Sequence, residues 1–224
     1  MLLEAMRPYE FPGEEWSQDE KEFLPVFLKS MGPNGLVLDL AGGYGRVTGL
    51  LVNRGSRATI LADLSIHSLR LARGSTSGAA DLVQADFLHL PFVQNVFEGV
   101  WFTQAFEYVP PDFREALLRD LYRTVKKSGL VFLNVARVPG EASFFSYLKS
   151  FVYWRILKRQ PVTWGDYIYR LKLEQYEGWH YHSVVFSRGI EKVFKKANFN
   201  VVESKSYRRG YLAYLLQAKP DKTG

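Results

Sequence analysis

The chain has 224 residues, of which 47% are hydrophobic and 15% aromatic, and its formal net charge is +6. This length and composition suffice for one domain with a substantial core, while the lack of cysteine excludes a disulfide framework and a thiolate metal site. No apolar run approaches the roughly 20 residues that a membrane-spanning helix needs, so we predict a soluble, cytoplasmic protein.

Residues 1–34 are predicted to form an N-terminal lid and a first helix. Met1–Trp16 mixes aromatic and acidic residues around a Pro-Gly pair, a composition typical of irregular structure. Ser17 then stands as a helix N-cap, and Glu20 three positions later completes a capping box. A helix should therefore begin directly after Ser17.

A glycine loop follows the first predicted strand. In Gly35–Thr48, GLVLDLAGGYGRVT, a short apolar run carries Asp39 near its end and then breaks into the glycines at 42, 43 and 45. Such a run suits a strand buried on both faces, and the glycines allow a sharp turn and the close approach of a ligand to the backbone. A helical pattern resumes at Arg46 and ends at Gly55. Strand, loop and helix N-terminus together predict a nucleotide-type site.

Three interpretations of this loop stay open on its own residues. A dinucleotide-binding fingerprint requires a third glycine where the chain has Thr48. The acid at Asp39 would repel a pyrophosphate and suits a ligand that carries a cation or hydroxyl groups. The third interpretation is a glycine turn in an ordinary sheet protein.

Acids follow the next two predicted strands as well. Ala58–Ala62 leads into Asp63, eighteen residues beyond Gly45, where an acid can accept hydrogen bonds from both hydroxyls of a ribose. Ser65 then caps a helix. Asp81–Ala85 leads into Asp86, so acids stand at three successive strand ends.

The next segment completes a predicted parallel core. Phe97–Thr103 forms a fourth strand, and residues 130–136, LVFLNVA, form a fifth. Pro110 and Pro111 open the helix between them, because proline is tolerated in a first helical turn. The inner face of that helix is predicted to carry Phe113, Leu117, Leu121 and Val125.

Three motifs in this core resemble a known family. VLDLAGGYG resembles the first motif of the class I S-adenosylmethionine-dependent methyltransferases, usually acid-x-Gly-x-Gly-x-Gly, with Ala41 in the first glycine position. ILADLSIHSLRLAR resembles the second motif, and LRDLYRTVKKSGLVFLNV resembles the ending of the helix and strand that follow. The resemblance covers Leu36 to Val135.

The resemblance implies a fold, a cofactor and a set of binding residues. The fold is α/β, a Rossmann-like, seven-stranded, mostly parallel sheet with helices on both faces and a helical, aromatic cap inserted after strand 5. The cofactor is S-adenosylmethionine, with S-adenosylhomocysteine as product. Asp86 would take the adenine amino group while Phe87 packs on the ring. The implied cofactor-binding residues are Asp39, Ala41, Gly42, Gly43, Gly45, Asp63, Leu64, Asp86, Phe87, Thr103 and Gln104.

The inserted cap, residues 136–183, has an unusual composition. It holds 12 of the 34 aromatic residues of the chain, and seven Lys or Arg against four acids. Glu141–Arg159 is predicted to be a helix that is apolar almost all round, as found in helices that are buried or lie against a partner or a membrane interface. The cap therefore either buries its aromatic residues against the sheet or builds the pocket for the methyl acceptor.

Methyl transfer from a sulfonium is an in-line displacement that needs no covalent nucleophile. An oxygen or nitrogen acceptor can still require a general base, and the candidates are Glu107, beside the end of strand 4, and His180 and His182 in the cap. No metal site is predicted.

Three functions stay open for the acceptor side. The first is methylation of a small or lipophilic molecule under the aromatic cap. The second is methylation of RNA, because residues 164–199 resemble the corresponding stretch of tRNA wobble-uridine methyltransferases and the charge of +6 favours an anionic partner. The third is a methyltransferase-like domain that binds RNA or a partner without catalysis. The oligomeric state is not predicted.

The predicted layout is a single methyltransferase domain, residues 1–224. Its parts are the N-terminal lid and helix (1–34), the cofactor-binding core (35–135), the substrate-cap insertion (136–183), and a final helix with two antiparallel edge strands (184–219).

Overall fold

The structure, a computed structural model, describes residues 17–32, 35–55, 58–136, 144–173, 176–184, 187–207 and 210–220. The predicted lid at Met1–Trp16 and the predicted helical start at residues 141–143 lie outside these residues. In chain order the elements are α1 (Gln18–Lys29), β1 (Val37–Leu40), α2 (Arg46–Gly55), β2 (Thr59–Asp63), α3 (Ile66–Ser75), β3 (Asp81–Gln84), β4 (Phe97–Phe102), the 3-10 turn η1 (Phe106–Tyr108), α4 (Pro111–Thr124), β5 (Val125–Ala136), α5 (Phe144–Val152), the π-helical turn η2 (Tyr153–Leu157), β6 (Asp166–Leu173), β7 (Tyr176–Ser183), α6 (Ser187–Lys196), β8 (Phe199–Ser206) and β9 (Tyr211–Ala218).

Seven strands form one sheet in the order β3-β2-β1-β4-β5-β9-β8. The first five are parallel to one another, and β9 runs antiparallel to both β5 and β8. The predicted sheet, mostly parallel with an antiparallel pair at one edge, is therefore confirmed. The strand order reverses between β1 and β4, since the chain first adds strands on one side of β1 and then on the other. Ligands of open α/β sheets bind beside the carboxyl ends of the strands at such a point.

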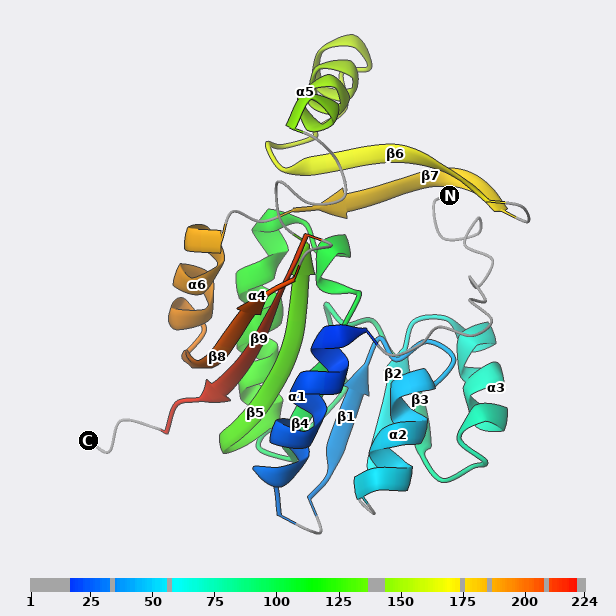
Figure 1. Cartoon of the computed structure of the whole chain (residues 1–224), viewed down its shortest axis with the longest axis vertical. Helices are drawn as coiled ribbons and strands as arrows, with labels where there is room; N and C mark the ends of the chain where they lie inside the picture. The colour runs from blue at the N-terminus through cyan, green and yellow to red at the C-terminus, as the bar shows by residue number, and fades with distance from the viewer. Residues whose placement is uncertain are drawn as a thin grey trace.

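Helices cover both faces of the sheet (Figure 1). On one face, α1 and α2 pack Phe23, Phe27 and Leu51 against Trp101 and Phe132 of the sheet. On the other face, the apolar sides of α4 and α6 enter the larger core, with Leu117, Leu121, Ile190 and Phe194 among its buried residues. The central strand β1 between these helices is buried on both sides, as its apolar run predicts.

The predicted helical, aromatic cap after β5 contains the helix α5, and in addition a β-hairpin that the sequence analysis did not predict. Strands β6 and β7 pair antiparallel, and Figure 1 shows this hairpin crossing the carboxyl-end edge of the sheet with α5 on its far side. The alternation of side chains explains the difference. Tyr167 and Tyr169 lie on one face of the hairpin with their cross-strand partners His182 and His180, whereas Trp179 and Tyr181 lie on the other face.

The inner face of α4 also differs from the predicted one. The Phe113 side chain is 51% exposed, whereas the neighbouring Arg114 is buried. Leu117 and Leu121 face the core as predicted. Strand β5 begins at Val125, earlier than predicted, and its register against β4 shifts between Val125 and Leu130.

Candidate active site

The glycine loop exposes its backbone at the carboxyl end of β1. Ala41, Gly43 and Gly45 all have positive φ angles, of 54°, 56° and 84°. A Cβ atom added at Gly43 would meet no atom within 4 Å. The main chain at Gly43 is therefore open to a ligand, and only glycine adopts this conformation without cost.

Asp39 lies directly against the glycine loop and stabilises it. Its carboxylate is buried and accepts a hydrogen bond from Oγ1 of Thr48 at 2.5 Å. A Cβ atom at Gly42 would lie 2.8 Å from Oδ2 of Asp39, so the loop can pass over this carboxylate only because residue 42 is glycine. Burial raises the pKa of Asp39 to about 7, against the opposing effects of the Thr48 hydrogen bond and the nearby Arg46 charge.

Asp63, at the end of β2, is fixed by two backbone amides. Gly43 N donates to Oδ2 at 2.9 Å and Ser65 N donates to Oδ1 at 2.8 Å. Ser65 is also the predicted N-cap, since its Oγ accepts from Ser68 N. Each Asp63 oxygen keeps a further lone pair, which suits a pair of neighbouring hydroxyls. Leu64 follows with an exposed side chain.

Asp86 and Phe87 follow β3 as predicted. Oδ1 of Asp86 accepts from Leu88 N at 2.8 Å, so this carboxylate shapes its own turn, and Oδ2 lies 3.5 Å from Nδ1 of His89. The Asp86 side chain is partly exposed, while Phe87 packs its ring 5.8 Å from that of Phe102. Asp86 thus stabilises the turn that follows β3. A ligand role for Asp86 stays a prediction.

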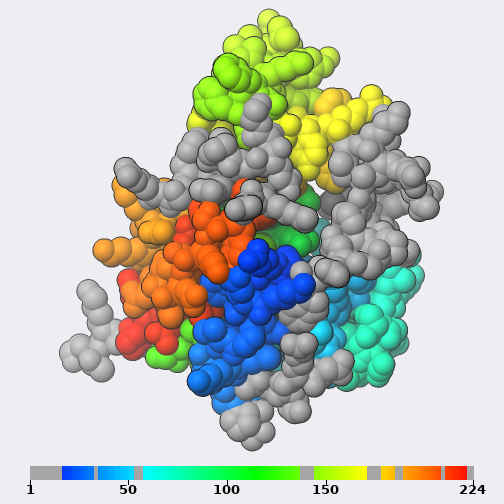
Figure 2. Space-filling model, in the orientation of Figure 1, coloured from blue at the N-terminus to red at the C-terminus, as the bar shows by residue number. Residues whose placement is uncertain are grey.

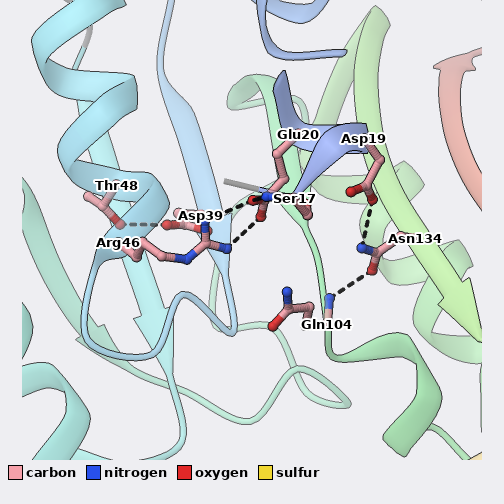
Figure 3. A network of polar contacts seen from close by, with 8 residues as sticks. All are labelled: Ser17, Asp19, Glu20, Asp39, Arg46, Thr48, Gln104 and Asn134. Atoms are coloured by element: carbon pink, nitrogen blue, oxygen red, sulfur yellow. Dashed lines mark hydrogen bonds and ion pairs between the residues drawn. The ribbon is translucent and has the colours of Figure 1, made fainter. Parts of the chain in front are cut away.

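The start of α1 is linked to the glycine loop by an ion pair. Glu20, fully buried, receives two hydrogen bonds from Arg46, at 2.6 and 2.8 Å (Figure 3). Its Oε2 also accepts from Ser17 N at 3.1 Å, which is half of the predicted capping box. The sequence suggested only the capping role of Glu20, because no local pattern identifies a partner 26 residues away.

A second link joins α1 to the ends of β4 and β5. Asn134 Nδ2 donates to Asp19 at 3.0 Å, and Gln104 N donates to Asn134 Oδ1 at 2.7 Å (Figure 3). Gln104 has a positive φ of 53° and an exposed side chain, and Thr103 precedes it at the strand end. Asp19 and Asn134 were not predicted as site residues.

The candidate bases lie on two elements that pack against each other, Glu107 on η1 and His180 and His182 on β7. Glu107 is buried in η1, and the adjacent Tyr108 ring lies 5.3 Å from the ring of His182. His182 Nε2 is 3.4 Å from the Tyr169 hydroxyl, and the His180 ring is 5.7 Å from the Tyr169 ring. Burial, together with the neighbouring His180, lowers the pKa of His182 to about 4, so this imidazole is neutral at physiological pH.

Arg114 of α4 holds the hairpin to η1. Its guanidinium donates to the Ser183 carbonyl at 2.7 Å and to the Val109 carbonyl at 3.2 Å, and it lies over the Phe106 ring. Burial lowers the pKa of Arg114. Nearby, Asp166 accepts from the hydroxyls of Tyr181 and Ser183, which fixes the near end of the hairpin.

These groups fit S-adenosylmethionine. Gly43 follows β1 and Asp63 ends the neighbouring strand β2, and a hydrogen bond from Gly43 N to Oδ2 of Asp63 joins them. The open backbone at Gly43 and the remaining lone pairs of Asp63 therefore lie side by side. A nucleoside whose ribose rests on Asp63 would therefore pass directly over the glycine loop.

Known proteins resemble this chain over the same region. Residues 37–129 match the family model of a methyltransferase domain. A ubiquinone/menaquinone biosynthesis C-methyltransferase of Stenotrophomonas maltophilia is 34% identical over 142 residues, which are 60% of this chain and 54% of that protein. A demethylmenaquinone methyltransferase of Corynebacterium urealyticum is 30% identical over 54% of this chain and 50% of its own. The chain thus spans about half the length of these curated relatives.

The fold has counterparts among solved structures. An S-adenosylmethionine-dependent methyltransferase of Methanosarcina mazei superposes with a TM-score of 0.72 at 15% identity, over 88% of this chain and 98% of the other. Together with the strand order, these comparisons show that residues 37–129 are a methyltransferase domain and that the chain has the fold of the class I S-adenosylmethionine-dependent methyltransferases.

Proposed function

We propose that this protein transfers the methyl group of S-adenosylmethionine to a small, lipophilic, ring-bearing acceptor of quinone-like chemistry. The observation that carries the proposal is the joint geometry of Gly43 and Asp63, which couples an open loop backbone to a fixed carboxylate. The names of the curated relatives support the acceptor class, because one is a ubiquinone/menaquinone biosynthesis C-methyltransferase and the other a demethylmenaquinone methyltransferase.

When bound, the cofactor supplies an electrophilic methyl group on a sulfonium. The residues of this chain then have two tasks, to hold the acceptor atom in line and to take up a proton where one is released. Alignment alone can contribute up to roughly 7–11 kcal/mol to lowering the barrier. Glu107 is the proposed proton acceptor because it is buried in η1, just after the carboxyl end of β4. The glycine loop follows the carboxyl end of the neighbouring strand β1.

The aromatic face of the hairpin is the proposed acceptor surface. Tyr167 and Tyr169 stack at 5.0 Å between their ring centroids, and His180 and His182 pair with them across the strands. The low pKa of His182 keeps this face uncharged. A flat apolar ring can pack against such side chains by offset or edge contacts, while the Tyr169 hydroxyl and the His182 nitrogen offer hydrogen bonds to ring oxygens.

RNA is less well supported as the acceptor. The two curated relatives described above are named for quinone substrates and not for RNA. The non-catalytic alternative is disfavoured by the site itself, because Asp39, Asp63 and the open Gly43 are all in place.

Calorimetry with S-adenosylmethionine tests the cofactor half of the proposal. We expect binding by the wild-type protein and a large loss in Asp63→Ala, whereas Asp81→Ala, which removes an exposed acid at the start of β3, should bind normally. No binding by the wild-type protein would refute the proposal.

Transfer of a labelled methyl group tests the acceptor half. Short-chain hydroquinones should become labelled and unfractionated tRNA should not. Labelling of tRNA alone, with an affinity that falls steeply with salt, would establish the RNA alternative instead.

A further inference from the structure

The segment α5–η2, Phe144–Leu157, carries an unusually apolar exposed surface. The exposed fractions of Phe145, Ile156 and Leu157 are 77%, 61% and 69%. Among the described residues, nine of the sixteen large exposed hydrophobic side chains lie between positions 144 and 179. Figure 2 shows this segment at the end of the molecule that projects beyond the hairpin. Soluble domains rarely expose a contiguous apolar surface of this kind without a partner for it.

Only a narrow side of α5 is used to hold it in place. Tyr147 is buried and its ring lies 4.5 Å from that of Tyr167. Ser150 Oγ donates to the Ile168 carbonyl and accepts from the Ile168 amide. The core of the sheet lies on the other side of the hairpin, so it does not cover the exposed side of α5 (Figure 1).

The segment and the three residues that follow it are basic. Residues 144–160 contain four Lys or Arg and no acid, and the side chains of Lys149, Arg155, Lys158 and Arg159 are all exposed. A helix that combines apolar side chains with several cations binds in the interface plane of a bilayer, where anionic lipid headgroups attract the cations. Aromatic side chains at its edges, such as Trp164 and Trp179, have the amphipathic character favoured at headgroup depth.

A second copy of the chain fits this surface less well. Protein interfaces are depleted of lysine at their centres, and a two-fold contact through residues 144–160 would bring their four cations opposite the same four cations of the other copy. Among the described residues no helix is long and apolar enough to cross a membrane. The geometry and charge therefore favour a segment that lies on a bilayer.

We infer that α5–η2 docks the protein on an anionic phospholipid surface. Because α5 rests on the hairpin at Tyr167 and Ile168, docking would hold the proposed acceptor face close to the headgroups, where a lipophilic substrate partitions. This last consequence rests on the proposed function. The docking itself does not, since it depends only on the exposed surface.

Vesicle flotation of the full chain tests the inference. We expect binding to vesicles of equimolar phosphatidylcholine and phosphatidylglycerol and little binding to phosphatidylcholine alone. The double variant Phe145→Ser with Leu157→Ser should bind roughly tenfold more weakly for each side chain removed. The matched variant Val93→Ser with Val202→Ser, which changes exposed apolar residues elsewhere, should bind like the wild type.

Two double variants that remove cations test the electrostatic contribution to vesicle binding. Arg155→Gln with Lys158→Gln should weaken binding to the mixed vesicles by roughly fivefold for each charge, while Lys192→Gln with Lys195→Gln on α6 should not.

No flotation of the wild-type protein, or equal losses in the α5 variants and their controls, would overturn the inference. A dimer in sedimentation that Phe145→Ser with Leu157→Ser dissociates would overturn it in favour of a second copy. Methylation of a water-soluble acceptor should be unchanged in the α5 variants, so failure of docking and failure of the proposed function are distinguishable.

Discussion

The backbone amide of Gly43 donates a hydrogen bond to Oδ2 of Asp63 across 2.9 Å, although the two residues are twenty positions apart. This bond sets the distance between the glycine loop and the carboxylate that we assign to the ribose. Loop and carboxylate therefore form one binding unit, and disturbing either should weaken cofactor binding.

Asp63→Asn should lower the affinity for S-adenosylmethionine by roughly tenfold to a hundredfold. The asparagine amide places a donor against either Gly43 N or Ser65 N, and it removes the charge that strengthens hydrogen bonds to hydroxyls. Calorimetry measures the affinity, with Asp81→Asn as the control for loss of an acid. Equal affinities in wild type and Asp63→Asn would contradict the assignment.

Ala41→Gly should stabilise the protein by about 0.5–1 kcal/mol. Alanine at a φ of 54° pays the steric cost of the left-handed region, and this exceeds the extra entropy that glycine loses on folding. Urea unfolding measures the change. Ala79→Gly, at an exposed position without a positive φ, should destabilise instead, and stabilisation by both variants would reject the explanation.

Glu20→Gln should destabilise the fold by about 3 kcal/mol, because it leaves the Arg46 guanidinium without its buried carboxylate. The comparison is Glu115→Gln, which breaks an exposed ion pair with Arg119 and should leave the unfolding midpoint unchanged. If the two variants have the same stability, the Glu20–Arg46 pair is not a structural link.

Asp39 should make stability depend on pH. Its pKa is about 7 in the folded protein and 3.8 in a model peptide, so the folded state binds the proton more tightly. Between about pH 4 and about pH 7 the unfolded state has lost this proton and the folded state has not, and the free energy of unfolding therefore falls as pH rises. The total fall attributable to Asp39 is roughly 4 kcal/mol.

Asp39→Asn removes this dependence. Urea unfolding at about pH 5 and about pH 8 should show that the variant gains stability relative to the wild type as the pH is raised. All other carboxylates are common to both proteins, so the difference isolates Asp39. A constant difference between the two proteins would show that Asp39 does not titrate in this range.

Glu107→Gln should reduce kcat by roughly a hundredfold or more with little change in the KM for the acceptor, if proton uptake limits the reaction. Asp112→Asn, an exposed acid on the following helix, is the control. Unchanged turnover in Glu107→Gln would reject the role of base and leave alignment as the main source of catalysis.

The core of the fold could be predicted because its signals are local. The apolar run of β1, the glycines at 43 and 45, and the Ser65 cap each specify their own turn or element within a few residues. The strand-end acid Asp63 also lies where the sequence predicts it.

The remainder depends on contacts that no local pattern contains. Arg114 is buried in place of Phe113 because it donates a hydrogen bond to the Ser183 carbonyl. This partner lies 69 residues away, so no local pattern indicates it. Asn134 meets Asp19 across 115 residues. The hairpin was not predicted because the aromatic residues of the cap suggested burial, whereas the alternation of Tyr167 and Tyr169 along β6 was the relevant signal.

The two hydrogen bonds of Arg114 link the cap hairpin to the turn that carries Glu107. One guanidinium holds the Ser183 carbonyl at the end of the hairpin and the Val109 carbonyl two residues beyond Glu107. The hairpin cannot lift away from α4 without uncovering a buried charge, and that movement would pull on the turn that carries the proposed base. The position of the hairpin and the position of the turn at Glu107 are therefore set by the same buried side chain, so a substitution of Arg114 should displace both.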